Sequence, residues 1–164
     1  MHRIGIFFGT ESGTTRLISK KIMKAMRARL GNDHVPKPLN INRAVPDEFL
    51  SHSFLVLGTP TYSDGMLPGR EAKLEDESWA EFLPKIEGQD LSGTRVALFG
   101  CGDQEEYPDH FQDGMGHLYE FFTAAGAELI GGCSTQGYSY NHSRAVIDDR
   151  FVGLAIDQHL QHLK

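Results

Sequence analysis

Hydroxyl-bearing residues gather in one short loop near the start of the chain. The stretch FFGTESGTTR occupies residues 7–16, and four of the six residues 10–15 carry a hydroxyl. A nucleoside triphosphate loop of the form G-x-x-x-x-G-K-[ST] would place a lysine here, and this loop has none. We therefore expect backbone N–H groups and hydroxyls at a helix start to hold a phosphate as a permanent anchor. The alternative is a plain helix N-cap at Ser12 or Thr14.

Aromatic and polar side chains follow two further apolar runs. The stretch GTPTYSDGMLPG covers residues 58–69 and carries Tyr62, and GCGDQEEYPDHF covers residues 100–111 and carries Asp103 and Tyr107. Two tyrosines on neighbouring loops are able to hold a flat ring between them, with polar groups at its edge. The alternative for Tyr62 is a side chain that only covers the end of a strand.

Short apolar runs alternate with helical patterns along the whole chain, and this alternation predicts an α/β fold with a mostly parallel sheet. Such sheets bind ligands at the carboxyl ends of their strands, where the strand order switches. The loops at these ends are residues 9–15, 59–77 and 101–109. The predicted strands cover 3–8, 53–58, 94–100, 127–132 and 151–157, with an edge strand at 35–42, and the predicted helices cover 14–29, 46–52, 78–87 and 110–126.

Composition narrows the class of protein. The 164 residues suggest one domain, and the net charge of −6 with a pI of about 5.7 disfavours nucleic acid and anionic membranes as partners and favours a basic one. The chain has no apolar run of transmembrane length, and its start lacks the order of a signal peptide, so we expect a cytoplasmic protein. Cys101 and Cys133 are then free thiols.

A resemblance to a known family is carried by the three loops. FFGTESGTT, GTPTY and GDQEEYPDHFQD resemble the flavin loops of long-chain flavodoxins, and STQGYSYNHSRAVIDDRFVGLAID resembles the insertion that splits their fifth strand. A phosphate at one end and a sandwiched ring at the other describe FMN, and flavodoxin is itself the standard example of a ligand at such a switch point. The resemblance implies one FMN-binding domain over residues 1–164, with the insertion at about 133–150. The implied sheet is a doubly wound, five-stranded parallel sheet in the order 2-1-3-4-5, with helices on both faces.

The resemblance also implies a set of cofactor-binding residues. The residues that would hold the phosphate are Thr10, Glu11, Ser12, Gly13, Thr14 and Thr15. Those at the second loop, beside the inner face of the flavin, are Thr59, Pro60, Thr61, Tyr62, Ser63, Asp64 and Gly65. Those at the third loop are Cys101, Gly102, Asp103, Tyr107, His110, Phe111 and Gln112, with Tyr107 as the outer stacking ring. No residue is expected to be catalytic or to bind a metal.

A narrower resemblance concerns the physiological partners. LNINRAVPDEF, the extended segment from Ser63 to Gly93 and YPDHFQDGMGHLYEFF resemble the nitrogen-fixation branch of the family. It implies a monomeric, low-potential one-electron carrier that is reduced by an upstream oxidoreductase and passes electrons to the nitrogenase iron protein or another acceptor. The competing interpretations are an FMN-dependent quinone or NAD(P)H reductase on the same fold and a flavin-free receiver module. No arrangement of histidine, serine and cysteine suggests an enzyme with its own substrate.

Two departures from the family pattern carry expectations. Ser63 stands where that branch commonly has glycine. A backbone conformation with positive φ costs a residue with a side chain about 1 kcal/mol more than glycine. We therefore expect the flavin semiquinone to be less stabilised here than it would be with glycine at this position. After LAID the family continues with a final amphipathic helix, whereas this sequence ends at QHLQHLK. We expect apolar surface on one sheet face where that helix would pack.

The charges beside the loops predict a strong reductant. Each carboxylate about 8 Å from the flavin would oppose its reduced, anionic form by roughly 0.5–2 kcal/mol before salt screening. A phosphate without a neighbouring cation would act in the same direction. The carboxylates on or beside the flavin loops are Asp64, Asp103, Glu105, Glu106 and Asp109, and the alternative for each is a solvated loop charge.

Overall fold

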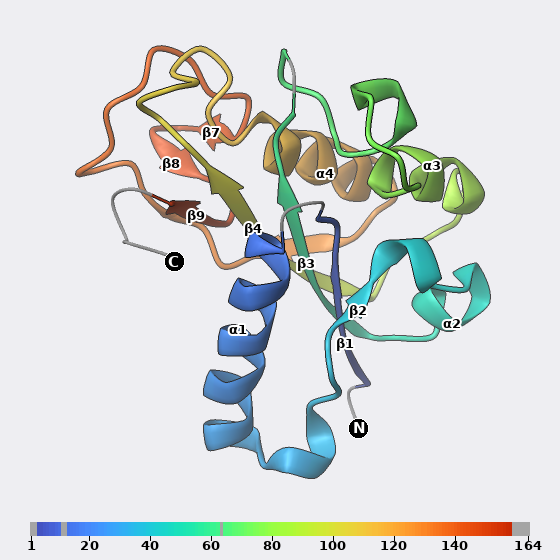
Figure 1. Cartoon of the computed structure of the whole chain (residues 1–164). Helices are drawn as coiled ribbons and strands as arrows, with labels where there is room; N and C mark the ends of the chain where they lie inside the picture. Colours follow the sequence, from blue (N-terminus) through green and yellow to red (C-terminus); the bar gives the residue numbers. More distant parts are fainter. Residues whose placement is uncertain (1–2, 11–12, 63, 159–164) are drawn as a thin grey trace.

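A parallel sheet forms the centre of the molecule (Figure 1). The computed structural model describes residues 3–10, 13–62 and 64–158. Five parallel strands follow the order β2-β1-β3-β4-β5, which confirms the predicted strand order and the doubly wound fold class. Their bounds are β1 Ile4–Phe8, β2 Leu39–Asn40, β3 Phe54–Pro60, β4 Arg95–Gly102 and β5 Glu128–Ile130.

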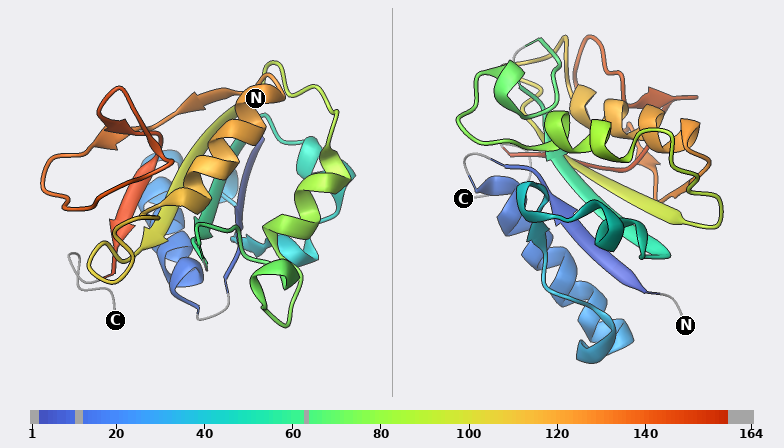
Figure 2. Two further views of the ribbon diagram at one scale, coloured as in Figure 1. Left: turned by 90° about the horizontal axis from the view of Figure 1, so that it is seen from above. Right: turned by 90° about the vertical axis from the view of Figure 1, so that its right-hand side faces the viewer.

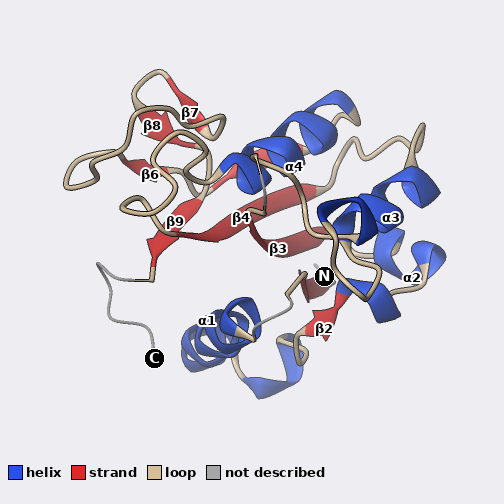
Figure 3. Ribbon diagram, turned by 45° about the horizontal axis from the view of Figure 1, so that its top comes forward, coloured by secondary structure: helices blue, strands red, loops and turns tan. Residues whose placement is uncertain are grey.

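The fifth position of the sheet is shared by two strands. β5 pairs with the first part of β4, from Arg95 to Ala97, and β9 (Leu154–Asp157) pairs with its last part, from Phe99 to Gly102. The chain between them forms a small antiparallel sheet of β6 (Cys133–Ser134), β8 (Arg150–Phe151) and β7 (Val146–Ile147). The predicted insertion therefore splits the fifth strand, and it lies at the end of the molecule away from α2 (Pro46–Leu50; Figure 3).

Helices cover both faces of the sheet, as predicted (Figure 2). α1 (Thr14–Leu30) packs on one face, where Ile18 joins an apolar cluster with Ile6 and Phe8. On the other face α3 (Trp79–Phe82) and α4 (Asp113–Ala124) lie with α2 over the larger core. Short 3₁₀ turns at Asn32–His34, Ile41–Arg43, Arg70–Ala72 and Leu83–Ile86 complete the helical elements.

Aromatic side chains fill the larger core. Trp79 and Phe49 are fully buried, and their ring centroids lie 6.4 Å apart in an edge-on arrangement. The Trp79 indole Nε1–H donates to the Gly58 carbonyl oxygen at 2.9 Å, so its one polar group is satisfied inside the core. The same carbonyl accepts the Gly9 N–H at 3.0 Å. These two bonds join the ends of β1 and β3 to α3, which begins at Trp79.

Several predicted elements differ in extent. The strand predicted at 151–157 is divided between β8 and β9, and the strand predicted at 127–132 is reduced to β5. The edge strand at 35–42 is reduced to β2, because Pro36 and Pro38 cannot donate to a ladder. The helix at 78–87 becomes α3 followed by a 3₁₀ turn that contains Pro84. The helix at 110–126 begins only at Asp113, because the residue before it adopts a left-handed conformation with φ 63°.

The sheet face that α1 covers also carries exposed apolar surface near β9. Leu154 is 44% exposed, and Ile156, which points to the same face, is partly buried against the smaller cluster. The sequence led us to expect apolar exposure on one sheet face, without indicating which. In the described part of the chain, no helix combines the length and the apolar character needed to cross a membrane.

Candidate functional site

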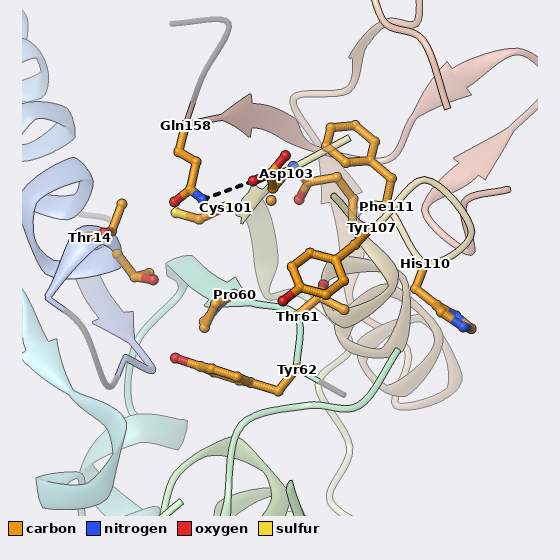
Figure 4. Close-up of a pocket in the computed structure, with 13 residues that line it drawn as sticks. Thr14, Pro60, Thr61, Tyr62, Cys101, Asp103, Tyr107, His110, Phe111 and Gln158 are labelled. Carbon is orange, nitrogen blue, oxygen red and sulfur yellow. Dashed lines mark hydrogen bonds between the residues drawn. The ribbon is translucent and has the colours of Figure 1, made fainter. Parts of the chain in front are cut away.

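One cavity lies where the carboxyl ends of the parallel strands meet (Figure 4). Its volume is about 190 Å³, and all three predicted loops contribute to its wall. Every lining residue except Gln158 belongs to the predicted cofactor-binding set. The lining consists of Thr14, Thr15, Pro60, Thr61, Tyr62, Cys101, Gly102, Asp103, Tyr107, His110, Phe111, Gln112 and Gln158.

The first loop is organised by its own backbone and one hydroxyl. Gly13 occupies the N-cap position of α1 with φ 91°, so the alternative of a side-chain cap at Thr14 is wrong, while Ser12 and Glu11 lie outside the described residues. The Gly13 N–H donates to Thr10 Oγ1 at 2.9 Å. The helix therefore starts at Thr14, with its positive end beside the cavity.

A second hollow of about 460 Å³ adjoins this loop. Thr10 and Gly13 line it together with Arg16, whose guanidinium carbon lies 5.6 Å from the centre of the Phe8 ring. A cationic side chain therefore lies beside the first loop, although Arg16 does not line the cofactor cavity itself. The helical pattern had assigned Arg16 to the solvent side of α1, and it is indeed exposed there. The other lining residues are Asn40, Leu74, Glu75, Asp76, Glu77 and Ser78.

The second loop leaves β3 and turns back on itself at once. The Tyr62 N–H donates to the Met66 carbonyl at 2.9 Å, and the Met66 N–H donates to the Tyr62 carbonyl at 2.7 Å. Pro60, Thr61 and Tyr62 line the cavity, and Asp64 is exposed. Two other predicted residues lie behind the wall: Thr59 is 1% exposed, and Gly65 is buried against α4. Ser63 lies outside the described residues.

The third loop is held by a buried carboxylate. Asp103 is 4% exposed, and its Oδ1 accepts the N–H groups of Glu105 and Glu106 at 3.1 and 3.0 Å. Asp103 therefore organises the loop and also lines the cavity, so the alternative of a solvated loop charge is wrong for this carboxylate. Tyr107 projects into the cavity while 53% of its surface stays exposed, so it is accessible to a ligand. Glu105, Glu106 and Asp109 remain exposed beside it.

A fourth segment, which sequence reasoning missed, completes the wall. Gln158 follows β9, and its Nε2 donates to Asp103 Oδ2 at 3.3 Å (Figure 4). The preceding Asp157 is 1% exposed, and its Oδ2 accepts the Gln104 N–H at 2.8 Å. The signal was present in the sequence, because the carboxyl end of a strand that pairs with β4 must reach the same edge of the sheet.

The start of α4 connects the cavity to the insertion. Asp113 Oδ2 lies 3.0 Å from His110 Nδ1, and Asp113 Oδ1 accepts the Arg144 N–H at 2.7 Å. The Arg144 guanidinium in turn donates two hydrogen bonds to the Glu120 carboxylate, at 2.9 and 3.0 Å. These hydrogen bonds hold the pKa of Glu120 below its ordinary value. The insertion is thereby fixed to the helix that underlies the second and third loops.

Cys101 lies in the cavity wall as an unreactive thiol. Burial raises its pKa to about 11, against the weaker opposing effect of a hydrogen bond with Thr15. At pH 8 only about one in a thousand such thiols is a thiolate, the reactive form. We expect iodoacetamide at pH 8 to modify the partly exposed Cys133 in the folded protein and Cys101 only after unfolding. Peptide mapping by mass spectrometry checks this, and equal rates for the two thiols would contradict it.

The wall suits a flat, polar-edged ligand. Tyr62 and Tyr107 present aromatic surface from two different loops, and Gly102 also lines the cavity. Gln112 is 1% exposed, and its Oε1 has no hydrogen-bond partner in the described part of the chain, while its Nε2 donates to the Ile156 carbonyl at 3.1 Å. The Oε1 atom packs against β4, because a Cβ atom on Gly100 would lie 2.0 Å from it. Within the described ranges, no group of three or more His, Cys, Asp or Glu side chains is arranged to hold a metal ion.

Comparison with known proteins identifies the family. Residues 6–162 match the sequence profile described as Flavodoxin. A flavodoxin of Klebsiella pneumoniae is 48% identical over 158 residues, which cover 96% of this chain and 87% of that protein, and a flavodoxin of Synechocystis is 38% identical over 158 residues, which cover 96% and 86%. The crystal structure of Fusobacterium nucleatum flavodoxin bound to flavin mononucleotide superposes with a TM-score of 0.84 at 31% identity, covering 99% of this chain and 89% of that one.

The fold and the cavity at its strand ends thus define a protein of the flavodoxin-like class. Within this class, the chain belongs to the flavodoxin family.

Proposed function

We propose that this chain is an FMN-dependent one-electron carrier. The observation that carries the proposal is the cavity between Tyr62 and Tyr107 at the end of α1, in a member of the flavodoxin family. The FMN-bound structure of the Fusobacterium relative supports the choice of cofactor. FMN supplies the redox chemistry by accepting and releasing electrons one at a time, while the protein sets its binding, orientation and electrostatic surroundings.

Each segment around the cavity would have one task. The start of α1, with the hydroxyl groups of Thr14 and Thr15, would receive the phosphate. The two tyrosines would enclose the flavin ring and exclude water from its faces. The Gln112 amide and the backbone at Gly102 would contact the polar edge of the ring. The other predicted residues that line the cavity would have the roles that the family resemblance implies, whereas Thr59 and Gly65 lie behind its wall.

Surface charge would favour a basic redox partner. The whole chain has a net charge of −6, and part of this charge lies beside the third loop, on the exposed carboxylates of Glu105, Glu106 and Asp109. Arg16 would offset part of the phosphate charge, so the low potential would depend more on these carboxylates than the sequence alone suggested. Association with a basic partner would be fast and would slow as salt screens the charges.

The nitrogenase iron protein is the acceptor that we propose. The support is the resemblance of residues 63–93 to the nitrogen-fixation branch. A monomeric protein in the cytoplasm, with one domain over residues 1–164 and an upstream oxidoreductase as its donor, belongs to the same proposal. If it is right, the reduced protein transfers electrons to the purified iron protein at a rate that falls with ionic strength. No transfer at low salt would exclude this acceptor.

Stepwise anaerobic reduction with dithionite, followed by visible spectroscopy, tests the carrier function. We expect a bound yellow flavin that is reduced in two resolved one-electron steps. A flavin that bleaches in a single step, together with rapid oxidation of NAD(P)H, would instead identify a reductase. A colourless protein that fails to take up added FMN would overturn both functions.

A further inference from the structure

α4 holds the turn after Tyr62 at more than one point. The Gly114 N–H donates to Thr61 Oγ1 at 2.8 Å, just before the turn. Gly65, at the far side of the turn, has φ 87°, and a Cβ atom there would lie 2.6 Å from Asp113 Oδ2 and 3.0 Å from His110 Nδ1. The α-carbon of Gly65 therefore rests directly on the His110–Asp113 pair.

A histidine one turn further along α4 makes another contact with this segment. His117 Nε2 lies 2.9 Å from the Gly65 carbonyl oxygen, across 52 residues of sequence. Because a carbonyl oxygen only accepts, Nε2 must carry the proton and donate it. His117 is partly buried, so this bond is sheltered from competing water. It is a side-chain bond to the backbone of the loop that carries Tyr62.

The bond acts on the cavity through a short chain of contacts. Gly65 precedes Met66, and Met66 is joined to Tyr62 by two backbone hydrogen bonds. Tyr62 lines the cavity, whereas neither Gly65 nor His117 does. A hydrogen-bond donor at position 117 therefore fixes the Gly65 end of the turn. The backbone bonds between Met66 and Tyr62 then fix the Tyr62 ring, which would face the cofactor.

We propose that His117 is a positioning residue that tethers the Tyr62–Met66 turn through the Gly65 carbonyl and so preorganises the cofactor loop. Without the tether the turn samples open conformations, and a ligand that needs the closed one binds more weakly. The tether itself is a property of the protein alone, whereas its effect on FMN rests on the proposed function.

The test compares two substitutions of His117 in the apoprotein. H117L removes the donor at similar volume, and H117Q retains an N–H group near the position of Nε2. Hydrogen exchange of the Tyr62 and Met66 amides, which are bonded to each other across the turn, is followed by NMR. We expect the exchange rates of both amides to rise about three- to tenfold in H117L, which corresponds to the loss of one hydrogen bond. In H117Q we expect the wild-type rates. His34→Leu, at an exposed histidine far from the loop, is the control.

Two results would overturn the tether: unchanged exchange in H117L, or H117Q that behaves like H117L. The amides of β3 and β4 monitor global unfolding in the same spectra, and if H117L loses their protection, H117A replaces it with the same expectation. FMN titration forms the second readout, where the dissociation constant should rise by the same factor in H117L and recover in H117Q. If wild type binds no FMN while the exchange result holds, the proposed function fails and the tether stands. If exchange changes but FMN affinity does not, the tether has no part in positioning the cofactor.

Discussion

Replacing Gly114 with alanine is expected to weaken FMN binding about tenfold. A Cβ atom at this position would lie 2.4 Å from the Pro60 carbonyl oxygen and 3.1 Å from Thr61 Oγ1. Because the first of these is a backbone atom, the loop itself has to shift away from α4. Overpacking of this kind costs about 1–3 kcal/mol, and 1.4 kcal/mol of lost binding energy is a factor of ten. Calorimetric titration of the apoprotein with FMN measures the effect.

Gly116 offers a matched control two residues along the same helix. A Cβ atom there would lie 2.7 Å from the Arg144 carbonyl carbon and oxygen, so G116A crowds the insertion and not the cavity loop. Both variants should lose a comparable amount of unfolding free energy in urea, and only G114A should lose FMN affinity. Equal losses of affinity in the two variants would show that global destabilisation, and not the position of Pro60, limits binding.

Gly58→Ala is expected to lower the free energy of unfolding by about 3 kcal/mol. Gly58 and Phe99 are direct neighbours on β3 and β4, and a Cβ atom on Gly58 would lie 2.0 Å from Phe99 Cζ. The Phe99 ring is 1% exposed and belongs to the smaller apolar cluster, so moving it would disturb other buried side chains. A shift of Gly58 would also strain its carbonyl, which accepts from both Trp79 and Gly9.

A double-mutant cycle separates this clash from other effects. Phe99→Leu shortens the ring side chain and should cost about 1–2 kcal/mol by itself. Combined with G58A it should recover part of the loss, giving a coupling energy of about 1 kcal/mol or more. Urea unfolding of the four proteins supplies the numbers. Strict additivity would mean that the ring contact is not the cause.

The sequence located the central strands well and their ends less well. β1, β3 and β4 contain continuous apolar runs, which are the expected signal of strands buried on both faces. β3 and β4 extend to Pro60 and Gly102, beyond the last residues of their apolar runs. The backbone pairing between strands continues there although the side chains are no longer a continuous apolar series. The start of α4 was placed too early because a left-handed glutamine at position 112 leaves no mark in a helical pattern.

The site was predicted from the loops that follow strands. This rule explains which lining residues were found and which were missed. Tyr62 and Tyr107 were found because each lies a few residues beyond an apolar run. Gln158 was missed because the split strand hides its place beside β4 until the insertion is recognised as a separate sheet. Arg16 and His117 sit on helix faces, and only the packing of α1 and α4 reveals which loop each one meets.

The divided fifth strand has a consequence for the order of folding. β9 can join β4 only after the chain has passed through the whole insertion, and closing such a long loop is entropically slower than pairing β5. The end of β9 also supports the third loop, since Asp157 accepts the Gln104 N–H and Gln158 donates to Asp103 across 55 residues. We therefore expect the part of the cavity wall that Gln158 supplies to form after β5 has paired with β4.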